Sequence, residues 1–128
     1  MAAKVVDASA IAAVVFGEPE GMEVWQRLES SSLWAPPLFP YEIANICWKK
    51  VRRFPEQREK LLEAYSLLGR IEIEEVEVLA SEAFLLADRE NLTVYDASYL
   101  WLALKLGVEL VTLDGDLNKA ASRLSEST

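Results

Sequence analysis

Residues 94–121 read VYDASYLWLALKLGVELVTLDGDLNKAA, and this stretch decides the class of fold. The run 94–106 is apolar nearly all round, which predicts a helix at the centre of the molecule. Gly107 is expected to end this helix, because glycine readily adopts the left-handed conformation found after many helices. Residues 110–111 then predict a buried strand, and residues 117–124 a terminal helix. This order is typical of an α/β fold with a parallel sheet.

The rest of the chain alternates predicted strands and helices in the same way. Further strands are expected at residues 5–6, at residues 34–35 and over the alternating apolar and acidic stretch 71–78. The helices expected between them cover residues 10–16, with Ser9 as the cap, and residues 18–30, 40–53, 56–70 and 79–90. The side chains expected to face inward include Met22, Val24, Trp25 and Leu28 in the second of these helices and Leu61, Leu62, Tyr65 and Leu68 in the fourth. We therefore expect residues 1–128 to form a single domain, a three-layer α/β/α fold with a mostly parallel central sheet.

The composition limits the chemistry that this chain can perform. It has 128 residues, 52% of them hydrophobic, and no histidine, which excludes Ser-His-Asp and Cys-His catalysis and zinc sites that need imidazole. Its single cysteine, Cys47, excludes an internal disulfide and is expected in the core, in keeping with a reducing cytoplasm. The longest uncharged run, residues 8–17, is too short to span a bilayer, and we expect neither a signal peptide nor a membrane partner.

The formal net charge of −8 taken alone argues against a nucleic-acid partner, unless some acids are gathered to hold cations. Four acids lie at the ends of predicted strands or at the starts of predicted helices. Asp7 and Asp114 each follow a predicted strand, whereas Glu42 and Asp96 each lie in the first turn of a predicted helix. Each has an ordinary local explanation as a turn residue, a helix cap or a charge favoured by the helix dipole. In particular, Thr93 and Asp96 resemble a capping box, with Thr93 as the cap of the helix that follows.

These four positions share one edge of a parallel sheet, where such folds bind their ligands. Four carboxylates close together repel one another, and a divalent cation among them reverses that cost. Oxygen ligands suit Mg²⁺ or Mn²⁺. The neighbouring side chains Ser9, Thr112 and Asn45 are candidates to orient a carboxylate or a water, although each also suits a cap or a turn.

Four motifs in this sequence resemble those of the PIN-domain nucleases, and the likeness is closest to the small VapC-type toxin ribonucleases. The motifs are VVDASAI (5–11), PPLFPYEIANICW (36–48), TVYDASYLWLAL (93–104) and LVTLDGDL (110–117). No single motif is specific, but the ordered set covers nearly the whole chain. The resemblance assigns the family's acidic positions to Asp7, Glu42, Asp96 and Asp114, with Asp116 as a frequent further ligand.

The resemblance implies hydrolysis of RNA phosphodiester bonds with Mg²⁺ or Mn²⁺, by an endoribonuclease in the cytoplasm. Asp7 and Asp96 are expected to be the inner metal ligands, with Glu42 and Asp114 acting through water or a second ion. It also implies a homodimer and a cognate antitoxin protein. A basic stretch, with Phe54 beside it for base stacking, suggests an RNA-contacting rim or simply favourable helix-end charges; it consists of Lys49, Lys50, Arg52 and Arg53.

Two other functions remain open from the sequence. One is a PIN-like scaffold that binds RNA or a protein without cutting, which the complete set of four acids argues against. The other is a phosphoacceptor or phosphatase domain on a doubly wound sheet. That class generally needs a lysine near the site, and an aspartyl phosphatase also needs a second acid two residues after the first, where this chain has Ser9.

Overall fold

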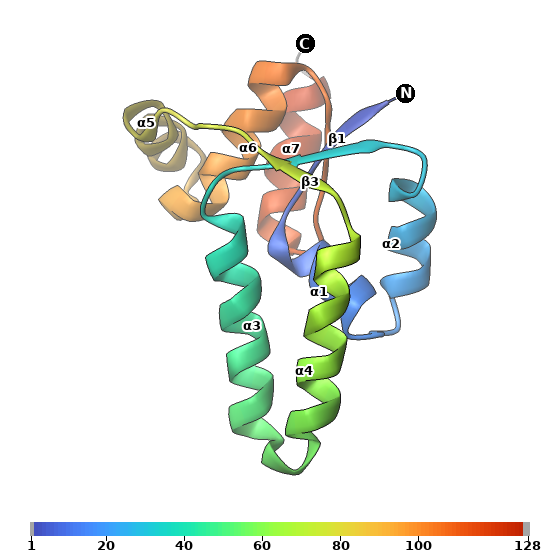
Figure 1. Ribbon diagram of the computed structural model, residues 1–128. Helices are drawn as coiled ribbons and strands as arrows, with labels where there is room; N and C mark the ends of the chain where they lie inside the picture. Colours follow the sequence, from blue (N-terminus) through green and yellow to red (C-terminus); the bar gives the residue numbers. More distant parts are fainter. Residues whose placement is uncertain (1, 127–128) are drawn as a thin grey trace.

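A parallel sheet forms the centre of the computed structural model, which describes residues 2–126 (Figure 1). Its strands are β1 (Ala3–Val6), β2 (Ser32–Ala35), β3 (Ile73–Glu75) and β4 (Glu109–Val111), in the spatial order β3-β2-β1-β4. Val5 of β1 is in register with Trp34 on one side and Leu110 on the other. The predicted α/β class with a parallel sheet is therefore confirmed, and every strand pair in the described residues is parallel.

Helices flank this sheet, and the middle of the helix predicted to be central is largely buried. They are α1 (Ala8–Val15), α2 (Gly21–Leu28), α3 (Phe39–Arg53), α4 (Arg58–Ser66), α5 (Ala80–Glu90), α6 (Val94–Leu106) and α7 (Gly115–Glu126), with short 3-10 turns at Pro55–Gln57 and Leu67–Arg70. Tyr99, Leu100 and Leu102 of α6 are each 1% exposed. Gly107 ends α6 with φ 67°, as predicted. Cys47 is buried, also as predicted.

Helices α3 and α4 form a long hairpin that extends away from the sheet (Figure 1). The 3-10 turn at Pro55–Gln57 joins them at the far end. The first turn of α3 follows β2 closely in sequence, so this end of the helix stays beside the carboxyl edge of the sheet. Residues near Phe54 lie at the tip of the hairpin, far from that edge (Figure 1).

The N-terminal helices differ from the prediction. Helix α1 begins at Ala8, and its cap is Asp7 rather than Ser9, because the Asp7 carboxylate accepts the backbone N–H of Ala10. The predicted helix 18–30 is shortened to Gly21–Leu28.

Two side chains predicted to face inward on α2 are exposed: Met22 is 76% and Trp25 38% accessible. Only Val24 and Leu28 are buried among the predicted four, because α2 packs a narrow stripe against α1. The two helices approach so closely that a Cβ on Gly21 would stand 2.3 Å from the backbone oxygen of Ala13.

The middle of the chain is also less regular than predicted. Residues 56–70 form α4 between two 3-10 turns, and Leu62 is 43% exposed instead of inward. The predicted strand 71–78 shrinks to Ile73–Glu75 and ends where its alternation of apolar and acidic residues slips. β3 is an edge strand and pairs only with β2 among the described residues. Within residues 2–126, no helix is long and apolar enough to cross a membrane.

Candidate active site

Asp7 is a buried carboxylate at the carboxyl end of β1. It is 5% exposed, and donors surround both of its oxygens. Its Oδ1 accepts the hydroxyl of Ser9 at 2.7 Å and the amide of Ala10 at 3.0 Å, and its Oδ2 accepts the hydroxyl of Thr112 at 2.5 Å. Asp7 is therefore both a helix cap, as its local sequence suggests, and a carboxylate held in one orientation.

Two hydroxyl groups connect that carboxylate to the segment after β4. The amide of Asp114 donates to Oγ1 of Thr112 at 3.0 Å, and the amide of Leu113 donates to Oγ of Ser9 at 3.0 Å. The carboxylate of Asp114 in turn caps α7 by accepting a backbone N–H from its first turn at 2.9 Å. The carboxyl ends of neighbouring strands β1 and β4 are thus fixed to each other through side chains that the sequence singled out.

Glu42 is held from the other side of the site by a residue that sequence reasoning missed. Its Oε1 accepts the hydroxyl of Tyr99 at 2.6 Å, although 57 residues separate them along the chain. Tyr99 itself is 1% exposed. One signal was available: Tyr99 follows Asp96 by three residues and so lies on the same face of α6. Nothing in the sequence indicated that this face meets α3.

Asp96 begins the buried helix at the same edge of the sheet. Its backbone N–H donates to the hydroxyl of Thr93 at 3.1 Å, so Thr93 caps α6 as the sequence predicted. The carboxylate of Asp96 is half-buried and faces the pocket described next.

A pocket of about 240 Å³ brings the four acids together from four separate segments of the chain. Its lining consists of Asp7, Ala8, Ser9, Glu42, Asn45, Ile46, Lys49, Asp96 and Asp114. Asp116 does not line it, but its charge still acts on Asp96. The structure therefore places Asp7, Glu42, Asp96 and Asp114 at one site, with Asn45 beside them.

The acids in this pocket disfavour one another's charged forms. Burial raises the pKa of Asp7, hydrogen bonds from Thr112 and Ser9 partly offset that rise, and the charge of Asp114 adds to it. Burial also raises the pKa of Glu42, and the charges of Asp96 and Asp7 raise it further. The hydrogen bond from Tyr99 partly offsets this rise. For Asp96, burial and then the charges of Asp114 and Asp7 raise the pKa. The pocket therefore gathers four carboxylates, with Lys49 as the one basic side chain in its lining.

The donor set fits a hard divalent cation. Every acidic ligand in the pocket offers carboxylate oxygen, which Mg²⁺ and Mn²⁺ prefer, and the chain has no histidine to favour a softer metal. In the arrangement that the structure describes for residues 2–126, no three acidic or cysteine side chains stand close enough together to hold a metal ion. Asp7 uses both of its carboxylate oxygens in hydrogen bonds, whereas Glu42 and Asp114 each use one, with Tyr99 and with the backbone of α7.

The basic stretch of α3 divides in the structure. Lys49 lines the pocket, whereas Lys50 forms an ion pair with Glu18 at 3.0 Å. The guanidinium groups of Arg52 and Arg53 lie over the rings of Trp48 and Phe54, respectively. Only one of the four predicted cations thus contributes to the pocket wall.

A larger cavity of about 580 Å³ lies between α6, β4 and α7. None of the predicted site residues lines it. Its one acid, Glu109, is paired with Arg27 at 2.7 Å. The predicted site residues therefore gather at the smaller, acidic pocket and not at the larger cavity.

Comparison with known proteins shows the family to which the chain belongs. The family model described as PIN domain matches residues 4–123. Ribonuclease VapC3 from Pyrobaculum aerophilum is 36% identical to the chain over 118 residues, which cover 88% of this chain and 90% of that protein.

Two crystal structures share the fold. PAE2754 from Pyrobaculum aerophilum matches with a TM-score of 0.61 at 24% identity, over 98% of this chain and 96% of the other. VapC20 from Mycobacterium tuberculosis, described as a Sarcin-Ricin loop cleaving toxin, matches with a TM-score of 0.65 at 19% identity, over 92% and 95%. With the family model and the VapC3 relative each covering most of the chain, this protein belongs to the PIN-domain family and, within it, to the VapC ribonucleases.

Proposed function

We propose that this protein is an endoribonuclease that hydrolyses RNA phosphodiester bonds with Mg²⁺ or Mn²⁺. The observation that carries the proposal is the convergence of Asp7, Glu42, Asp96 and Asp114 on one pocket. Within residues 2–126, none of these four carboxylates forms an ion pair with a basic side chain. Such a cluster is costly without a cation and is suited to holding one.

The residues divide into distinct roles. Asp7, fixed by its hydrogen bonds, and Asp96 would be the inner ligands of a bound cation, whereas Glu42 and Asp114 would act through water or a second ion, with Asp116 as a further ligand. A bound cation would lower the pKa of a bound water and offset charge on the scissile phosphate. Hydrogen bonds from Ser9 and Thr112 orient the carboxylate of Asp7, and a hydrogen bond from Tyr99 orients that of Glu42. Asn45 and Lys49 on the pocket wall suit contacts to a phosphate.

We also propose that the chain acts as one domain in the cytoplasm, as the toxin of a toxin–antitoxin pair. The description of VapC20 as a toxin supports this role. The partners would be a cognate antitoxin and a second copy of the chain. Exposed apolar side chains at α5, namely Leu79, Phe84 and Leu85, offer a surface for a protein partner.

The test is RNA cleavage with and without a cation. We expect cleavage of single-stranded RNA with Mn²⁺, none with EDTA, and a loss of roughly 10²–10³-fold in rate for Asp7→Asn. Asp88→Asn is the matched control, because Asp88 is an exposed acid on α5 outside the pocket. Mn²⁺ should also raise the melting temperature of the parent protein, since it binds only the folded state.

Three results would contradict the proposal. Full cleavage by Asp7→Asn would end the assignment of the site. Binding of RNA without cleavage under any divalent cation would favour a catalytically inactive scaffold. A phosphoaspartate found by mass spectrometry after acyl-phosphate treatment would favour a phosphoacceptor domain.

A further inference from the structure

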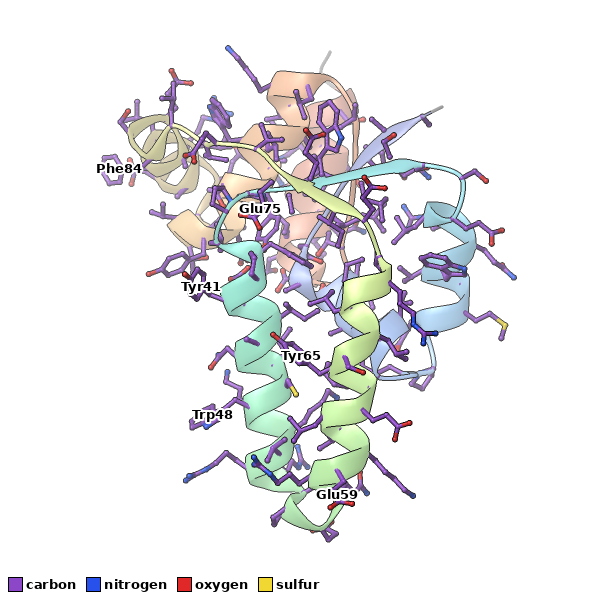
Figure 2. All side chains as sticks on the ribbon, viewed as in Figure 1. Tyr41, Trp48, Glu59, Tyr65, Glu75 and Phe84 are labelled. Atoms are coloured by element: carbon purple, nitrogen blue, oxygen red, sulfur yellow. The ribbon has the colours of Figure 1, made fainter. Side chains whose placement is uncertain are left out.

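One face of α3 carries a row of exposed aromatic and polar side chains. Tyr41 is 80% and Trp48 57% exposed, and both project from the same side of α3, away from α4 (Figure 2). Asn45 lies between them in sequence, and Arg52 follows Trp48 by one turn. We call Tyr41, Asn45, Trp48 and Arg52 the aromatic stripe.

Helix geometry makes these four positions a continuous row. Their spacings of four, three and four residues keep them on one face of α3. At 1.5 Å per residue, the rings of Tyr41 and Trp48 lie about 10 Å apart along the helix axis. Asn45 belongs to the stripe and also lines the acidic pocket, as does Lys49 on the next face. The stripe therefore runs beside the pocket and ends beyond it toward the hairpin tip.

The chemistry of the stripe differs from that of the other exposed apolar surface. On α3 the exposed large apolar side chains are both aromatic, whereas α5 and its cap expose Leu79 and Leu85 as well as Phe84. The guanidinium of Arg52 lies 5.4 Å from the centre of the Trp48 ring. Flat rings interleaved with a guanidinium and an amide match the flat bases and the phosphates of a nucleic acid. Exposed aliphatic side chains match a protein partner instead.

We propose that the aromatic stripe is the track on which unpaired RNA bases stack as the strand enters or leaves the acidic pocket. This inference rests on the proposed ribonuclease function and adds a substrate-binding surface to it. Stacking on a protein ring needs a base that is free of its own duplex, so the stripe selects single-stranded RNA. Arg52 and Lys49 supply cations for the backbone of the same strand, in a protein whose net charge would otherwise repel it.

The stripe also replaces a sequence-based expectation. Phe54 was the aromatic residue expected to stack on a base, but it lies at the tip of the α3–α4 hairpin, with Arg53 over its ring at 5.3 Å. Phe54 follows the pocket residue Asn45 by nine residues, which corresponds to about 14 Å along a helix. Trp48 is nearer to the pocket and more exposed.

The experiment measures RNA affinity without cleavage. Fluorescence anisotropy of a labelled single-stranded RNA is recorded in the Asp7→Asn background, which prevents turnover. We expect Trp48→Ala and Tyr41→Ala each to weaken binding roughly 5-fold to 100-fold, as for loss of one base–ring stack. Trp48→Phe, which keeps a ring, should retain most of the affinity. Trp25→Ala on α2 is the matched control and should bind as the parent does, because Trp25 is also exposed but lies outside the pocket and the stripe.

A second arm compares RNA forms. The Asp7→Asn parent should prefer the single strand over the same sequence in a duplex, and Trp48→Ala should lose most of that preference. Melting temperatures of all variants should stay near the parent value, because the replaced rings are exposed.

The outcomes separate the inference from the proposed function. If the stripe variants bind RNA as tightly as the parent while the unmodified protein cleaves RNA with Mn²⁺, the stripe is wrong and the ribonuclease function stands. If Trp48→Ala changes only the oligomeric state in size-exclusion chromatography, the surface contacts protein and the inference is overturned. If the unmodified protein neither binds nor cleaves RNA, both fail together.

Discussion

Carboxylates occur at both ends of the sheet, in two opposite electrostatic settings. At the amino ends of β1 and β4, Glu109 lies 3.3 Å from Lys4 and 2.7 Å from Arg27. Burial would raise the pKa of Glu109, but hydrogen bonds from Arg27 and Lys4 outweigh it and hold that pKa below its usual value. At the carboxyl ends of the same two strands, Asp7 and Asp114 meet hydroxyls, amides and other acids instead.

The difference separates a carboxylate that stabilises the folded state from the carboxylates for which we propose a role in catalysis. An acid whose pKa is lowered by a cation is favoured in its charged form by the folded state, as for Glu109. An acid whose pKa is raised by burial and by neighbouring acids is disfavoured in that form, as for Asp7 and Asp96. A fold that keeps such a cluster retains a local instability, which is typical of functional sites.

Asp96→Asn should have the largest effect and sharpen this contrast most. Removing one charge from the pocket should lower RNA cleavage roughly 10²–10³-fold. The same change should raise the melting temperature of the metal-free protein by about 2–5 °C, because it relieves repulsion. Cleavage assays and calorimetry with EDTA measure the two effects. A variant that loses both activity and stability would mean that Asp96 is a structural acid like Glu109.

Tyr99→Phe should have the next largest effect, because it removes the hydrogen bond that positions Glu42. Burial and the hydrogen bond to Glu42 raise the pKa of Tyr99 well above its usual range, so its hydroxyl remains a donor. We expect kcat and Mn²⁺ affinity to fall roughly 10-fold to 100-fold, with KM for RNA unchanged.

Mn²⁺ titration calorimetry and a double-mutant cycle with Glu42→Gln measure whether Tyr99 acts through Glu42. Tyr65→Phe on α4, outside the pocket, is the matched control. Additive losses in the cycle would show that Tyr99 acts independently of Glu42.

The pH dependence of stability should separate the two classes of acid. Asp7, Glu42 and Asp96 have raised pKa values, so without metal their contribution to stability grows as the pH falls through those values. Hydrogen bonds from Arg123 and Arg89 lower the pKa of Glu90, and the pKa of Glu109 is also below its usual value. The contribution of these two acids is present above the ordinary glutamate value of 4.5 and is lost as the pH falls through their lower values.

The melting temperature of the metal-free protein should therefore rise by a few degrees as the pH falls from neutral toward the ordinary carboxyl values of 3.8 and 4.5, and should fall below them. Saturating Mn²⁺ should flatten the first part, since the cation favours the charged pocket. A flat curve without metal would contradict the account of the pocket.

Arg27→Met should have the smallest effect. The Arg27 and Glu109 side chains are 42% and 50% exposed, and water weakens such a pair, so the expected loss is about 0–1 kcal/mol. RNA cleavage should be unchanged, because Arg27 lies outside the acidic pocket. Thermal unfolding at low and high salt measures the loss of stability. A loss of cleavage activity would contradict the prediction, because it would mean that the Arg27–Glu109 ion pair influences the acidic pocket at the other end of the sheet.

Part of the site is encoded locally and part is not. Thr93 as the cap of α6 and Gly107 as its end are properties of short segments, and the structure confirms both. The exposure of Met22 and Leu62 was not foreseen, because apolar spacing marks a face without saying how much of that face a partner covers. Both Ser9 and Asp7 suit the cap of α1 by their sequence, and the structure shows that Asp7 occupies that position.

The sequence by itself determined the order of strands and helices, and with it the parallel sheet and the edge where Asp7, Glu42, Asp96 and Asp114 collect. These follow from local periodicity and from the fact that parallel strands end at one edge. Only the tertiary structure decided that Tyr99 holds Glu42, that Thr112 holds Asp7, and that Lys49 faces the pocket while Lys50 pairs with Glu18. Such contacts join residues far apart in the chain, and they depend on how helices pack against the sheet, which no short segment encodes.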